Sequence, residues 1–203
     1  MLKPFCSFLV TILISIFFLT SCSEEKPLAV TAPAEKKPEV KEEKVTPPEP
    51  PQKRKVLVKD KKGWKVIKVD SFNSDDKGWK AIDGNPKTMW HTEWKAKQPK
   101  HPHEIQVDLG KKIEMHGFSY LTRQYGALNG TIKEYEFYVS NDRKKWGEPI
   151  KKGIFEDIQY DRGLQVIYFD KPVEGRYIRL VSKSEVQGMP FACCAELNIV
   201  IEE

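Results

Sequence analysis

Glu104-Ile105-Gln106-Val107-Asp108-Leu109 is the stretch that decides the fold class, because its apolar and polar residues alternate without exception. Strict alternation is typical of a β-strand with one face on a core and the other in water. Other short stretches rich in apolar, aromatic and β-branched residues lie at 64–69, 117–122, 135–140, 165–169, 177–181 and 197–201. Turn residues such as Asp83-Gly84-Asn85-Pro86 and Asn129-Gly130 separate them, and no long helical period interrupts the series. The pattern predicts an all-β fold, an antiparallel sandwich.

The charge of the chain is mixed. Its 34 basic and 29 acidic residues give a formal net charge of only +5. A nucleic-acid-binding protein needs a concentrated basic face, so this balance argues against nucleic acid as the main partner.

The N-terminus has the pattern of an export signal over residues 1–21. Lys3 precedes an uncharged apolar run at 8–19, which is shorter than the roughly 20 residues that span a bilayer. An uncleaved membrane anchor remains the alternative. Leu19-Thr20-Ser21-Cys22 resembles the bacterial lipobox, which implies that Cys22 is acylated and becomes the first residue of the mature protein. Ser23, in place of Asp, implies the outer membrane if the cell is Gram-negative.

Residues 22–60, called the tether below, contain half of the 14 prolines of the chain and no aromatic residue. Such a segment lacks the apolar bulk that offsets the entropy of ordering, so we expect a disordered, extended spacer. Aromatic residues begin at Trp64, so the folded domain is predicted over 61–203.

Eight short motifs of the predicted domain match one family in order. The motifs are Trp64-Lys65-Val66, Ala81-Ile82-Asp83-Gly84-Asn85, Thr88-Met89-Trp90-His91-Thr92, Val107-Asp108-Leu109-Gly110, Arg123…Asn129-Gly130, Tyr135-Glu136-Phe137-Tyr138-Val139-Ser140, Arg176-Tyr177-Ile178-Arg179-Leu180 and Ala195-Glu196-Leu197. On these motifs the chain resembles the coagulation factor V/VIII type C, or discoidin, domains over roughly residues 62–202, and in particular the family 32 carbohydrate-binding modules. The resemblance implies an eight-stranded, jelly-roll-like β-sandwich with its ligand loops at one end.

The resemblance implies a structural calcium site at Asp83, Thr88 and Glu196. Calcium binds six to eight oxygens from carboxylates, hydroxyls and carbonyls, which these side chains and their turn can supply. Taken alone, Asp83-Gly84 is more often just a turn.

A carbohydrate site is implied at five positions: His91, Trp94, Arg123, Asn129 and Phe191. In similar modules the His, Arg and Asn hydrogen-bond galactose-type sugars, and an aromatic residue before the last strand packs on the sugar face. Three structural alternatives stay open: Arg123 as a salt-bridge partner, Trp94 in the core, and Phe191 as a cap of the sandwich. Trp90 is assigned to the core. Tyr125 and Leu128 are less polar than is usual in their loop, so they add an apolar contact or change the preferred sugar.

The remaining reactive residues give no catalytic pattern. His101-Pro102-His103 is interpreted as a solvated loop rather than a metal site, and adjacent Cys193 and Cys194 as small buried thiols. The sequence therefore predicts no enzyme but a membrane-anchored, galactose-binding lipoprotein. The alternative is an adhesion or scaffold module that binds a protein or phospholipid partner at the cell envelope.

Overall fold

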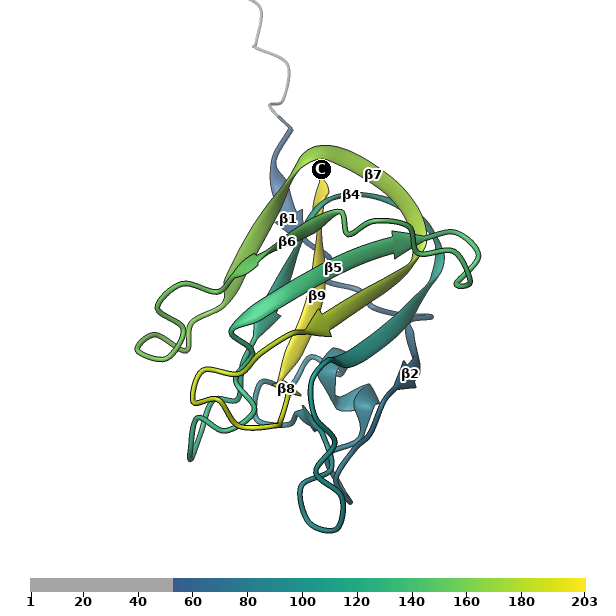
Figure 1. The fold of residues 1–203 in the computed structure, drawn as a ribbon. Helices are drawn as coiled ribbons and strands as arrows, with labels where there is room; N and C mark the ends of the chain where they lie inside the picture. The colour runs from purple at the N-terminus through teal and green to yellow at the C-terminus, as the bar shows by residue number, and fades with distance from the viewer. Residues whose placement is uncertain (1–52) are drawn as a thin grey trace, which may run out of the picture. The chain divides into compact units, whose positions relative to one another are not determined.

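The structure is a computed structural model, and it describes residues 53–203 (Figure 1). The predicted signal peptide, the lipidated Cys22 and the tether up to residue 52 lie outside the described residues. Among the residues that are described, no helix has the length and apolar character needed to cross a membrane.

The regular secondary structure of the described chain consists of antiparallel strands and one short 3-10 helix, as the predicted all-β class requires. One sheet has the strand order β1-β9-β4-β7-β5-β6, with β2 also paired to β4, and β3 and β8 form a second, two-stranded sheet. The elements are β1 (Lys55–Leu57), β2 (Lys65–Val69), the short 3-10 helix η1 (Gly78–Ile82), β3 (Trp90–His91), β4 (His103–Leu121), β5 (Glu134–Ser140), β6 (Lys151–Ile154), β7 (Gln165–Ser182), β8 (Cys193–Cys194) and β9 (Glu196–Glu202).

Two long strands join the layers of the sandwich. The first half of β4 pairs with β2 and with the second half of β7, whereas the second half of β4 pairs with β9 and the first half of β7. The register of this pairing shifts between Asp108 and Ile113. Gly110 lies in this break with φ +78°, and a Cβ added to it would lie only 3.1 Å from the Gly63 carbonyl oxygen, so the position favours glycine. The predicted strands at 104–109 and 117–122 are thus two arms of one bent strand, and those at 165–169 and 177–181 are the two arms of β7.

The predicted tether extends too far toward the domain. Lys55–Leu57 forms β1 and pairs with Glu202, Ile201 and Val200 of β9. The edge of the sheet is covered by the apolar side chains of Val56, Leu57 and Val58. The basic and Pro-rich residues before them led to the prediction of a solvated spacer. The ordered chain therefore begins before residue 61.

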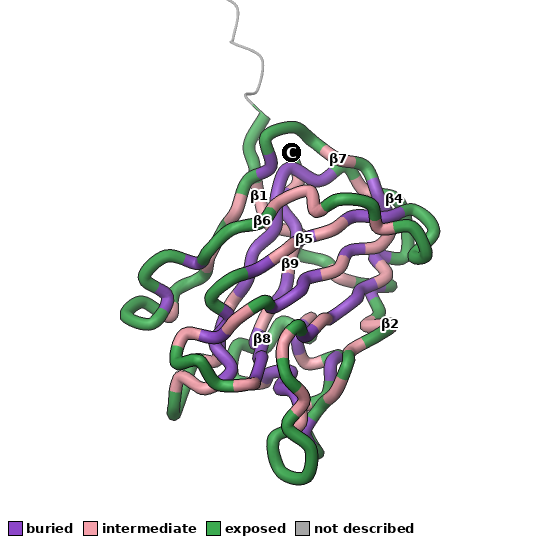
Figure 2. The backbone as a smooth tube through the Cα atoms, viewed as in Figure 1, coloured by how far each residue is buried: buried purple, intermediate pink, exposed green. Residues whose placement is uncertain are grey.

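The core lies between the layers and is aromatic. Ile105 and Val107 of β4 are fully buried, which confirms the inward face that their alternation predicts. Buried positions run along the strands, whereas the loops are mostly exposed (Figure 2). The rings of Phe118 and Phe137 stack with centroids 4.1 Å apart, and Phe155 packs against the edge of the first. Full burial of a Phe side chain contributes roughly 1.5–3 kcal/mol, so this cluster is a main stabilising element of the sandwich. Trp90, 1% exposed, belongs to this core as predicted.

Candidate functional site

The short strand β8 brings three loops together at one end of the sandwich. Cys193 pairs with His91 of β3 on one side and bridges to Thr131 on the other. The segment that follows β3, the loop 122–130 and the segment 190–192 therefore become neighbours. Four of the five predicted sugar-site residues, His91, Arg123, Asn129 and Phe191, form a set that we call the loop cluster.

His91 presents a buried nitrogen to this cluster. The side chain is 2% exposed, and its Nδ1 lies 2.8 Å from the Thr92 carbonyl oxygen, to which it donates. Nε2 has no hydrogen-bond partner among the described residues. Burial lowers the pKa of His91 below its usual 6.5; the bond to Thr92 opposes this shift and the positive charge of Arg123 adds to it. His91 is accordingly neutral at pH 7, with Nε2 as a hydrogen-bond acceptor.

Arg123 holds the neighbouring loop and keeps donors free. Its Nε donates to the Tyr125 carbonyl at 3.1 Å, and its Nη1 donates to Oδ1 of Asn129 at 2.6 Å. Nη1 also lies 3.2 Å from the Asn129 carbonyl. Nη2 makes no hydrogen bond to the described residues, so it remains a donor for a ligand. Among the described residues Arg123 makes no salt bridge, so its structural role consists of hydrogen bonds to its own loop.

Gly130 is required at the centre of the cluster. Its φ is +88°, a conformation that side chains rarely adopt. A Cβ at this position would lie 3.0 Å from His91 Nε2 and 3.1 Å from Cys193 Cβ. The absence of a side chain lets the Asn129 turn lie against the imidazole.

Glu185 is a residue that the sequence analysis missed. The side chain is almost fully buried, and its Oε1 accepts from the Gly130 amide at 3.2 Å. Its Oε2 accepts from the amides of Gln187 and Met189 at 2.6 and 3.0 Å. One carboxylate therefore fastens the Asn129–Gly130 turn to the loop that leads to Phe191. No local pattern distinguishes this Glu from the exposed acidic residues of other turns.

The aromatic residues around the cluster differ in exposure. Phe191 is 6% exposed and packs against His91 with ring centroids 5.8 Å apart. Most of its surface therefore contacts other residues of the protein, and little of it is open to a ligand. Trp94 is 40% exposed on the loop after β3, which excludes the core position, and among the described residues it shares no hydrogen bond or ring contact with the cluster. Tyr125 is 53% exposed, and the Arg123 guanidinium carbon lies 5.9 Å from its ring centroid. Tyr125 is thus an open aromatic ring next to Arg123.

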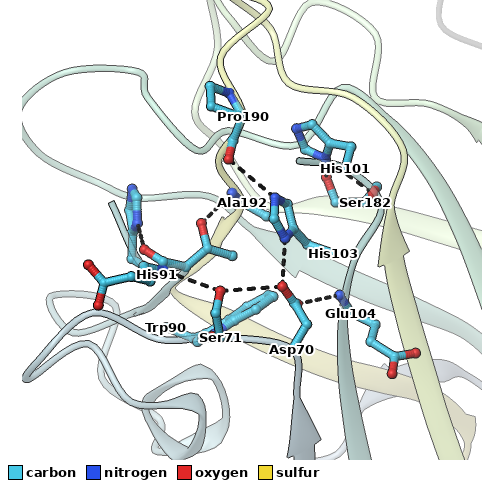
Figure 3. Close-up of polar contacts among 12 residues, drawn as sticks. Asp70, Ser71, Trp90, His91, His101, His103, Glu104, Ser182, Pro190 and Ala192 are labelled. Carbon is cyan, nitrogen blue, oxygen red and sulfur yellow. Dashed lines mark hydrogen bonds and ion pairs between the residues drawn. The ribbon is translucent and has the colours of Figure 1, made fainter. Parts of the chain in front are cut away.

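A buried polar network supports the segment that carries Phe191 (Figure 3). Ala192 is paired to Thr92 by two hydrogen bonds, one from each backbone amide. The His103 ring lies between Asp70 Oδ2, at 2.7 Å from Nδ1, and the Pro190 carbonyl, at 3.3 Å from Nε2. Burial would raise the pKa of Asp70, but hydrogen bonds from His103 and the Glu104 amide outweigh it and hold that pKa below 3.8. The prediction of a solvated 101–103 loop is therefore wrong for His103, which is fully buried at the start of β4.

The predicted calcium residues also lie close together. Thr88 donates its hydroxyl to Asp83 Oδ2 at 2.7 Å, and Lys61 pairs with Glu196 Oε2. Burial raises the pKa of Glu196, the Lys61 ammonium opposes this, and nearby Asp83 raises it further. Glu196 Oε1 is buried and has no partner among the described residues.

These groups fit a hard cation. Two neighbouring carboxylates and an unpartnered oxygen are the donors that Ca²⁺ prefers. The part of the chain that the structure describes has no group of three His, Cys, Asp or Glu side chains able to hold a metal. Calcium would therefore need the Thr88 hydroxyl and backbone carbonyls as well, and would share the site with the Lys61 ammonium.

The two cysteines of the described chain make no disulfide. Cys193 and Cys194 are both free and buried, and burial raises the pKa of each thiol. They are the small buried thiols that the sequence predicts, and their thiolates are disfavoured.

Fold and loops together define a β-sandwich domain that gathers polar side chains at its loop end. The chain belongs to the F5/8 type C domain family, whose model matches residues 66–197. The domain is similar to carbohydrate-binding modules of known structure, which supports the resemblance seen in the sequence.

Two solved structures show this similarity. The family 32 module of NanJ from C. perfringens, in complex with galactose, is 28% identical with a TM-score of 0.62, over 73% of this chain and 100% of that one. A second, CpGH89CBM32-5 from Clostridium perfringens in complex with GalNAc-beta-1,3-galactose, is 31% identical with a TM-score of 0.60, over 68% of this chain and 96% of that one.

Curated relatives match over the same domain. A galactose oxidase of Gibberella zeae is 37% identical over 138 residues, which are 67% of this chain and 19% of the oxidase. A sialidase of Micromonospora viridifaciens is 37% identical over 131 residues, 64% of this chain and 20% of the sialidase. The chain thus spans about a fifth of the length of these relatives.

Proposed function

We propose that this chain is a non-catalytic glycan-binding lipoprotein that recognises galactose-type sugars through the loop cluster. The observation that carries the proposal is the convergence of His91, Arg123 and Asn129 at one loop end. Two structural neighbours at 28% and 31% identity bind galactose and a GalNAc-galactose disaccharide. These complexes support the same ligand class here.

The chemistry of the cluster suits vicinal sugar hydroxyls. Arg123 can donate from Nη2, and Asn129 keeps its amide group for a further bond. The unpaired Nε2 of neutral His91 is a buried acceptor, so the loop at Gly130 must move slightly for a sugar hydroxyl to reach it. Hydrogen bonds to a charged group contribute about 1.5–3 kcal/mol each. Tyr125 and Trp94 are the exposed rings available for the apolar sugar face. We expect millimolar to micromolar affinity, roughly −4 to −8 kcal/mol.

Two further properties belong to this proposal. A lipid on Cys22 anchors the protein in the cell envelope, in the outer membrane of a Gram-negative cell, as the lipobox-like Leu19-Thr20-Ser21-Cys22 suggests. Anchored side by side, many copies raise the avidity of a weak sugar site. Calcium bound by Asp83, Thr88 and Glu196 stabilises the fold and takes no part in catalysis.

A glycan array tests the sugar assignment. The purified full chain should bind glycans that end in galactose or N-acetylgalactosamine, and Arg123→Ala should reduce the signal at least about tenfold because one charged donor is lost. Arg54→Ala removes the same charge at an exposed position away from the cluster and serves as the control. Absence of glycan binding by well-folded protein, or equal binding by Arg123→Ala, would refute the proposal.

A further inference from the structure

A second concave site lies on the face of the large sheet that points away from the core. Strand register places Lys68 of β2, Gln106 of β4, Arg179 of β7 and Tyr138 of β5 in one row across four strands. The residues that alternate with them, such as Ile105 and Leu180, face the core. Above the row, the loop after β5 adds Arg143 and Trp146, and the result is a pocket of about 420 Å³.

Arg179 is the central group of this pocket, and its guanidinium makes an ion pair with Glu104 but no hydrogen bond to the described residues. The guanidinium carbon lies 4.0 Å from the Tyr138 ring centroid and 4.8 Å from that of Trp146, so two aromatic rings hold it in place. Nε is buried and has no hydrogen-bond partner among the described residues. Nη1 forms an ion pair with Glu104 Oε2 at 3.6 Å, which is too long for a hydrogen bond.

The charges around Arg179 favour an anion. Glu104 is the acidic residue of the pocket lining, and its Oε1 already pairs with Lys68 and accepts from Gln106 at 3.2 Å. Lys68, Arg143 and Arg179 against one Glu104 leave a net charge of +2 on the lining. Arg143 is held with φ +64° by a turn in which its amide donates to Ser140 Oγ at 3.1 Å.

We propose that this pocket binds an acidic saccharide, with the sugar carboxylate on the Arg179 fork and the ring against Trp146. A planar guanidinium already held by aromatic rings can donate two parallel hydrogen bonds to a carboxylate at low entropic cost. The Trp146 ring is partly exposed next to the Arg179 donor. An aromatic ring beside a charged donor suits a pyranose that carries a carboxylate. The site shares no residue with the loop cluster, so it does not depend on the galactose assignment.

Titration of the full chain with methyl β-D-glucuronide, followed by NMR of the Trp146 indole N–H, tests the proposal. The signal is assigned by its loss in Trp146→Phe. We expect saturable shifts at Trp146 with the glucuronide and none with methyl β-D-glucoside, glucose 6-sulfate or acetate. Shifts of equal size with any of these three would overturn the assignment to a carboxylated sugar, and so would the absence of shifts with the glucuronide.

Three variants identify the groups that bind. Arg179→Lys keeps the charge but removes the fork, and should weaken glucuronide binding about tenfold or more. Glu104→Gln removes the competing carboxylate and should tighten binding, which tests the proposal even if Arg179→Lys fails to fold. Arg54→Lys is the control and should change nothing, whereas undiminished binding by Arg179→Lys or weaker binding by Glu104→Gln would overturn the proposal. Arg123→Ala should bind the glucuronide like the unchanged chain, which separates failure of this site from failure of the galactose site.

Discussion

At the scale of single residues, the loop cluster depends on side chains that serve the fold and the ligand together. Arg123 braces its own loop through Nε and Nη1 and offers only Nη2 outward. His91 is tied to the Thr92 carbonyl through Nδ1 and keeps Nε2 as an acceptor. Both side chains are therefore held in place before a ligand arrives, which lowers the entropic cost of binding.

His91 should make the stability of the domain depend on pH. Its folded pKa is lowered below 6.5, so the unfolded chain binds the proton more readily. The stabilisation from neutral His91 is complete above pH 6.5 and decreases as the pH falls below that value. Urea unfolding between pH 7.5 and 5 should show this loss, and His91→Gln should flatten it. Identical pH slopes in both proteins would contradict the argument.

The cluster residues themselves were predictable only through the family resemblance. Local patterns do not mark His91, Arg123 or Asn129, because their chemistry depends on loops that meet in space. Glu185 and His103 were missed for the same reason: His103 bonds to Asp70 and Pro190, which are 33 and 87 residues away. Burial of a polar side chain is decided by distant partners that spacing does not encode.

At the scale of elements, the alternation of apolar residues predicted the strands well and their connections poorly. The inward face of residues 104–109 is confirmed by the burial of Ile105 and Val107. The break between the arms of β4 contains Gly110 and two lysines, which indicate a turn, yet β7 pairs with both arms and makes them one bent strand. β1 was missed because three apolar residues give no usable period.

The loop between β7 and β8 should depend on Glu185. Glu185→Gln replaces an accepting oxygen by an amide donor, so a buried backbone N–H loses its partner. We expect a loss of about 1–3 kcal/mol in the free energy of unfolding. Galactose binding should weaken as well, since Glu185 positions the Asn129–Gly130 turn. Chemical denaturation and a sugar titration measure the two effects.

The control for Glu185→Gln is Glu156→Gln, which makes the same charge change at an exposed position. It should leave stability and binding unchanged. If Glu185→Gln behaved like this control, the carboxylate would not be the link between the two loops.

At the scale of the whole molecule, calcium should connect the first long loop to β9. Binding only to the folded state stabilises it by about 2.7 kcal/mol at a concentration one hundred times the Kd. The Tm should therefore rise with calcium and fall with a chelator, and Glu196→Gln should abolish the response. Lys61→Met should enlarge it, because the competing ammonium is removed. If calcium changed the Tm of neither the unchanged chain nor the two variants, Glu196→Gln and Lys61→Met, the calcium site would be contradicted.

The way in which the layers of the whole molecule join depends on strand register. The all-β class followed from strand alternation, whereas the joining of the layers required the register of β4 and β7. The domain matches about a fifth of the galactose oxidase and sialidase relatives. The oxidase and sialidase activities are therefore not carried over to this chain.

The most direct test of the central claim is an NMR titration of the full, isotope-labelled chain with methyl β-D-galactoside. We predict saturable shifts centred on His91, Arg123, Asn129 and their loop neighbours, with the Trp146 indole unchanged. Asn129→Ala should remove the shifts while the dispersed spectrum shows that the protein is still folded. A titration that leaves these residues unmoved, or that shifts only residues elsewhere on the sandwich, would contradict a galactose site at the loop cluster.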